Sequence, residues 1–122
     1  MPNVDERPPV WVGHIVLNVS DLERSSAFWN AVGMRPVERN DYVSIFELRG
    51  GTHLVLVKGA PAPGGAPFDL MVEDLDATHA AWAGSGLTVS AIERGDIHDG
   101  FKVTDPDGYV VDISNSHVVG TV

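Results

Sequence analysis

Cysteine is absent from this chain of 122 residues, and basic residues are few. Without a thiol the chain can form no disulfide, no cysteine-ligated metal site and no thiolate nucleophile. Eight lysines and arginines stand against 17 aspartates and glutamates, which gives a formal net charge of −9. Nucleic-acid binding draws its affinity from clustered basic side chains, so this composition argues against a nucleic-acid partner.

Long apolar runs are also missing from the sequence. No stretch approaches the length of about 18 apolar residues that a membrane span requires, and the opening MPNVDERPPV has no apolar segment of the kind found in signal peptides. We therefore expect no membrane contact and a cytoplasmic location. A chain of this length buries roughly two thirds of its unfolded surface. We expect residues 1–122 to form a single domain without disulfides or structural metal.

One segment of the chain occurs twice. VSDLERSSAFWNAVGM starts at Val19 and returns as VEDLDATHAAWAGSGL from Val72, with no gap between the copies. The matching pairs are Val19/Val72, Asp21/Asp74, Leu22/Leu75, Ala27/Ala80, Trp29/Trp82, Gly33/Gly86 and Met34/Leu87. Chance similarity between two amphipathic helices would rarely align both tryptophans and both closing glycines, so the chain is predicted to contain two copies of one unit.

Each copy has the pattern of a strand, a helix and three further strands. In the first copy β-branched residues predict a strand over 12–19, after which Ser20 or Asp21 caps a helix that Gly33 ends. The glycine- and proline-rich segment 59–67 is expected to be a linker between a first module, 11–58, and a second module, 68–115. The predicted helices are 22–32 and 75–85, and the remaining predicted strands are 34–39, 42–48, 52–58, 68–72, 87–93, 100–104 and 109–114.

Three segments resemble the vicinal oxygen chelate superfamily, which includes glyoxalase I, bleomycin- and fosfomycin-resistance proteins and extradiol dioxygenases. They are GHIVLNVSDLERSSAFWNAVGMRPV from Gly13, VEDLDA from Val72 and TDPDGYVVDIS from Thr104. The resemblance implies an α+β fold of two βαβββ modules whose sheets form an incompletely closed, cupped barrel. Such a barrel is often completed or paired in a homodimer, and the cup between the modules holds the ligand.

The resemblance also locates the places from which family enzymes bind a divalent metal. In this sequence those places are occupied by His14, Val55, Pro67 and Asp112, so two of the four carry no ligand atom. A catalytic ion generally needs about three protein ligands with open positions for substrate. Strand alternation offers an unorthodox set, because His53 and Asp69 lie at even spacing from the two lost positions. The low-probability metal candidates are therefore His14, His53, Asp69 and Asp112.

The predicted cup is an apolar bowl with a few polar points, which is the usual lining of a small-molecule pocket. We expect it to be lined by Val16, Asn18, Val55, Val57, Met71 and Val110, with Phe46 and Phe101 from the middle strands. Further expected ligand contacts are His53, Asp69, His98 and Ser114. His14 and His53 also have plainer interpretations, as a polar residue bonded to a neighbouring strand and as a partly exposed residue at the rim.

Two functions remain open at this point. The favoured one is a metal-free homodimer that sequesters an apolar organic ligand, such as an antibiotic or secondary metabolite, in the cleft between modules. The alternative is a metal-dependent lyase, isomerase or dioxygenase that uses His14 and Asp112 with an atypical third ligand and one divalent ion. A metal-free enzyme would instead pair His14 with Asp112, with the carboxylate orienting the ring.

Overall fold

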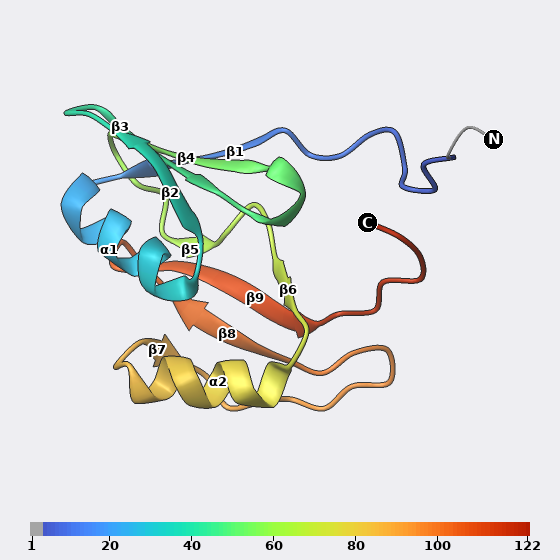
Figure 1. Cartoon of the computed structure of the whole chain (residues 1–122). Helices are drawn as coiled ribbons and strands as arrows, with labels where there is room; N and C mark the ends of the chain where they lie inside the picture. Colours follow the sequence, from blue (N-terminus) through green and yellow to red (C-terminus); the bar gives the residue numbers. More distant parts are fainter. Residues whose placement is uncertain (1–3) are drawn as a thin grey trace.

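The computed structural model describes residues 4–122 and shows an α+β fold of two βαβββ modules (Figure 1). The first module builds a four-stranded sheet in the order β1-β4-β3-β2, in which β1 runs parallel to β4 and the other neighbours are antiparallel. Its elements are β1 (His14–Val19), α1 (Leu22–Val32), β2 (Arg35–Arg39), β3 (Val43–Glu47), a 3-10 turn (Arg49–Gly51) and β4 (His53–Lys58).

The second module builds a five-stranded sheet in which β9 is the central strand. The order is β5-β9-β8-β7, and β6 also pairs with β9. Within the described residues the two sheets do not close into a barrel. The elements are β5 (Gly64–Gly65), β6 (Leu70–Val72), α2 (Leu75–Gly84), β7 (Thr88–Val89), β8 (Gly100–Thr104) and β9 (Tyr109–Asn115).

Equivalent residues begin and end the two helices. The Asp21 and Asp74 carboxylates each accept a hydrogen bond at 3.0 Å from the backbone N–H three residues on, which satisfies an otherwise free donor of the first turn. The chain leaves α1 at Gly33 with φ of 112° and leaves the α2 end at Gly86 with φ of 84°. Both angles lie in the left-handed region that favours glycine, and α1 ends where the sequence predicts, whereas α2 ends one residue before the predicted end at 85.

Each helix covers one face of its own sheet. Trp29 of α1 is 0% exposed and Trp82 of α2 is 7% exposed. The Trp29 ring also lies 6.0 Å from the ring of Phe68, which precedes β6, so the first helix contacts the start of the second module. The buried apolar residues of both modules form one continuous core.

Polar contacts also join the modules. The Tyr109 hydroxyl donates to the Asn18 carbonyl at 2.9 Å and accepts from the Ala62 N–H at 3.0 Å, so it links β9, β1 and the segment between the modules. The Asp107 carboxylate, with a side chain only 3% exposed, accepts bonds from the Ser20 N–H and hydroxyl. The turn before β9 therefore fastens the end of β1 to the second module.

Two segments differ from the sequence expectation. The predicted linker 59–67 contains the short strand β5, which pairs in parallel with β9. The predicted strand 87–93 is reduced to two residues in β7, because the Ser90 hydroxyl accepts the Lys102 N–H at 2.8 Å in place of a backbone carbonyl. Pairing resumes only at a single bridge between Glu93 and Gly100. Among residues 4–122 the structure has no helix long and apolar enough to cross a membrane.

Candidate functional site

Each sheet has one face packed under its helix and one open face. In β1 the side chains alternate between the two, since Leu17 and Val19 are buried while Val16 is 56% exposed. We use "first open face" for the side of sheet β1-β4-β3-β2 that carries Val16, and "second open face" for the side of the second sheet that carries Asp112. These two surfaces carry most of the residues that were predicted to line the cup.

Strand register arranges the first open face in rows that cross the sheet. The middle row is apolar apart from its outer end, with Val16 beside Val55, Val55 beside Ile45 and Ile45 beside Glu38. A second row consists of Asn18, Val57 and Val43. The last row is polar throughout, and its members in order across the sheet are His14, His53, Glu47 and Arg35.

The second open face is smaller and more mixed. Met71, which is 49% exposed, lies beside Ser114, and Ser114 lies beside Gly100. Next along the sheet, Asp112 lies beside Lys102, and the two form an ion pair whose hydrogen bond raises the pKa of the Lys102 ammonium. Val110 and Thr104 form the next pair.

The structure therefore places eight of the predicted ligand contacts on the open faces. They are Val16, Asn18, His53, Val55 and Val57 on the first face and Met71, Val110 and Ser114 on the second, although Ser114 is buried, at 7% exposed. Asp69 is exposed and directly precedes β6. His98 is exposed in the loop before β8, with its ring 6.0 Å from that of His117.

The two phenylalanines expected in the cup lie elsewhere. Phe46 is 2% exposed and Phe101 is 3% exposed, and both point to the helix side of their sheets. Phe101 packs its ring 5.7 Å from Trp82. The reason is strand alternation, since Ile45, the neighbour of Phe46, is the residue that lies beside Val55 on the open face. Phe46 instead borders a surface hollow of about 470 Å³ between α1 and β2.

The donor set for the metal implied by the resemblance does not fit. His14 and His53 are neighbours, with ring centroids 5.8 Å apart, but Asp112 is engaged with Lys102 on the second open face. Val55 and Pro67 supply no ligand atom. Over the residues that the structure describes, no three histidine, aspartate or glutamate side chains are placed to hold a metal ion. The proposed pairing of His14 with Asp112 is not formed among the described residues, because the Asp112 carboxylate is paired with Lys102.

A different histidine is paired with a carboxylate. His53 Nε2 lies 3.1 Å from Glu47 Oε1, and Glu47 forms an ion pair with Arg35 on its other side. The Arg35 hydrogen bond, followed by the bond from His53, lowers the pKa of Glu47. Sequence reasoning missed Glu47 and Arg35. The signal that could have found Glu47 was the turn at Gly50-Gly51, which pairs β3 with β4 and sets Glu47 opposite His53.

Known proteins of this architecture align along almost the whole chain. Lactoylglutathione lyase from Agrobacterium tumefaciens is 20% identical, with a TM-score of 0.77 over 94% of this chain and 100% of that one. TnmS3, an antibiotic binding protein from Streptomyces sp. CB03234, is 24% identical, with a TM-score of 0.75 over 90% and 98%. The oxidase ChaP-H2 is 16% identical, with a TM-score of 0.66 over 89% and 95%.

These likenesses establish the fold alone, because each identity is below 25% and the three proteins differ in what they do. No protein of curated function matches the sequence. The family model described as glyoxalase/bleomycin resistance protein/dioxygenase superfamily, by contrast, matches residues 11–113, which include both modules. The chain therefore belongs to the glyoxalase/bleomycin resistance protein/dioxygenase superfamily.

Proposed function

We propose that this protein is a cytoplasmic, homodimeric small-molecule-binding protein that captures an apolar organic molecule, such as an antibiotic or other secondary metabolite, without a metal ion. The observation that carries the proposal is the row of Val16, Val55 and Ile45 in the middle of the first open face. A largely apolar surface with a few polar groups at its margin has the composition that is usual in the lining of a small-molecule site.

The replaced metal positions favour binding over metal-dependent catalysis. Val55 adds apolar area where family enzymes have a ligand atom, and an aliphatic side chain there contributes contact with an organic ligand. The antibiotic-binding protein TnmS3 shows that this fold can serve such a role. The lyase and the oxidase have the same fold, so the fold alone does not distinguish binding from catalysis. The preference for binding therefore rests on Val55 and Pro67, which supply no ligand atom, and on Asp112, which is paired with Lys102.

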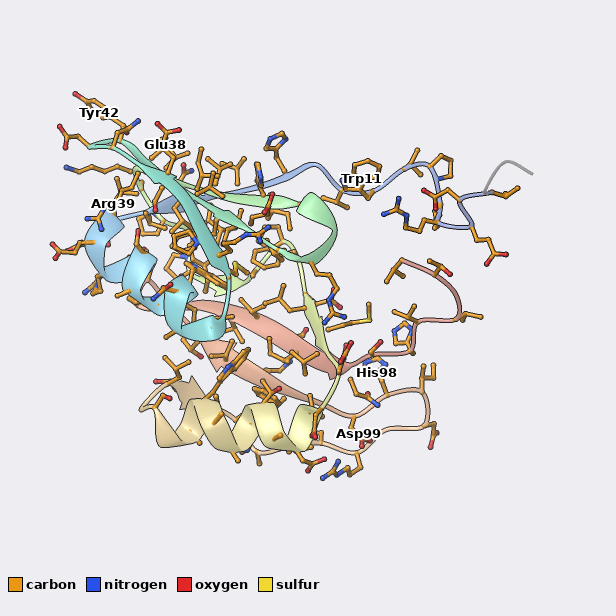
Figure 2. The ribbon with its side chains drawn as sticks, in the orientation of Figure 1. Trp11, Glu38, Arg39, Tyr42, His98 and Asp99 are labelled. Carbon is orange, nitrogen blue, oxygen red and sulfur yellow. The ribbon has the colours of Figure 1, made fainter. Side chains whose placement is uncertain are left out.

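A second copy of the chain is the partner that we propose for the open faces. Val10, Trp11 and Val12, just before β1, are 78%, 68% and 60% exposed, and Figure 2 shows Trp11 on the extended N-terminal segment, away from both helices. These residues expose apolar surface just before the polar row of the first open face, in addition to Val16 on that face. Stable interfaces bury about 800 Å² per partner, which is the area that a second copy on this part of the chain would have to bury.

Native mass spectrometry of untagged protein, purified without chelator, tests the proposal directly. We expect a dimer that carries no metal, either empty or with an organic molecule bound. Because dimer mass, metal and organic adduct are read from one spectrum, each part of the proposal is judged separately. A dimer with one divalent ion per chain would overturn the metal-free proposal and favour the lyase, isomerase or dioxygenase. A monomer would overturn the proposed homodimer.

A further inference from the structure

In the polar row of the first open face, Glu47 contacts His53 on one side and Arg35 on the other. His14, His53, Glu47 and Arg35 lie directly opposite one another on the four strands β1, β4, β3 and β2. The next row, two residues along β1, β4 and β3, contains Val16, Val55 and Ile45. A flat molecule lying on these aliphatic side chains would have one end against the imidazole of His53.

The hydrogen bond to Glu47 determines which ring nitrogen of His53 can accept a hydrogen bond from a ligand. Arg35 holds Glu47 in its ionised form, as the lowered pKa of that carboxyl indicates, and an ionised carboxylate only accepts hydrogen bonds. The contact of 3.1 Å between Glu47 Oε1 and His53 Nε2 therefore requires a proton on Nε2. In the neutral ring the lone pair is then on Nδ1, for which residues 4–122 provide no hydrogen-bond donor.

We propose that His53, oriented by Glu47, accepts a hydrogen bond at Nδ1 from a hydroxyl group on the ligand, so that the site selects aromatic molecules bearing a phenolic or enolic hydroxyl. This inference rests on the proposed function, because it names the ligand class of the same open face. The side chain of His53 is 31% exposed, so Nδ1 belongs to a ring that a ligand can reach.

Charge favours a neutral hydroxyl over a carboxylate in the ligand. A ligand carboxylate at His53 would approach the Glu47 carboxylate on a chain of net charge −9. The charge of Arg35 is already balanced by Glu47, so its guanidinium attracts a further anion less strongly than an unpaired arginine would. A phenol supplies a hydrogen-bond donor without a charge. It can therefore donate to His53 without being repelled by the Glu47 carboxylate.

The test compares two probes that differ only in the donor, 2-naphthol and 2-methoxynaphthalene, by isothermal titration calorimetry. We expect the wild-type protein to bind both and to prefer the naphthol by about fivefold, the size expected for one hydrogen bond. His53→Phe keeps an aromatic ring but removes the acceptor, so it should bind both probes equally. His117→Phe, in the exposed C-terminal tail, is the matched control and should keep the wild-type preference.

A second measurement needs no ligand. Nitrogen-15 NMR of the imidazole rings at alkaline pH should show His53 in the Nε2–H tautomer in the wild-type protein, and a tautomer mixture in Glu47→Ala. Equal binding of the two probes by the wild type, a preference that persists in His53→Phe, or an Nδ1–H tautomer would each overturn the inference and leave the proposed function standing. Failure of both probes to bind would contradict the proposed function itself, and the inference with it.

Discussion

Removal of the Tyr109 hydroxyl should loosen the connection between the two modules. Tyr109 is 4% exposed, and its hydroxyl bonds to the Asn18 carbonyl at 2.9 Å and to the Ala62 N–H at 3.0 Å. Tyr109→Phe leaves both groups without a partner, and a buried unsatisfied group costs about 1–3 kcal/mol. Because both contacts are only part-buried, we expect the lower end for each and a total loss of about 2 kcal/mol in unfolding free energy.

Urea unfolding followed by tryptophan fluorescence measures this loss, because Trp29 and Trp82 are buried and report the state of both modules. Protein concentration must be the same throughout, since association shifts apparent stability. The control is Tyr42→Phe, whose side chain is 73% exposed at the tip of the β2–β3 hairpin in Figure 2. If both variants lie within about 0.5 kcal/mol of the wild type, the reasoning about the Tyr109 hydroxyl is wrong.

Three further predictions concern single residues. If binding is the whole function, His14→Ala should change the affinity for the organic species found by native mass spectrometry by less than about tenfold, or 1.4 kcal/mol; a hundredfold loss of an enzymatic activity would contradict this. Burial raises the pKa of Asp105 above 3.8, so the native state holds its proton more strongly, and the contribution of Asp105 to the unfolding free energy should fall as pH rises from 3.8 through the raised pKa. Asp105→Asn should abolish that fall in urea titrations at stepped pH. A Cβ added at Gly100 would lie 2.9 Å from the Ile113 carbonyl oxygen, so Gly100→Ala should lower stability by about 1–3 kcal/mol in thermal melts, whereas Gly13→Ala, with nothing within 4 Å, should not.

Local signals made the helices and the two-module α+β fold predictable. The predicted helix 22–32 coincides with α1, because the capping aspartate and the closing glycine act within one turn of the helix that they bound. The strand 100–104 also coincides with β8. The end of β7 could not be predicted in this way, since it depends on a hydrogen bond from Lys102, which is distant in the sequence.

The site was less predictable, because its composition depends on pairing between strands. Alternation along β1 and β4 placed Val16 and Val55 on one face from the sequence alone. The pairing of β3 with β4 determines which face of the sheet each β3 side chain points to. It places Phe46 in the core and Glu47 on the open face. The position of Arg35 depends in addition on a register shift in β2 between Pro36 and Glu38, which no local pattern reveals.

The outer edge of the first sheet has a consequence for the behaviour of the protein at high concentration. All five residues of β2 are exposed, but the strand combines a proline that lacks an N–H, an irregular register and three charged side chains. These features obstruct the addition of another strand to an edge. The β2 edge of the sheet therefore resists fibrillar growth, so overexpression should not yield amyloid-like precipitation through this strand.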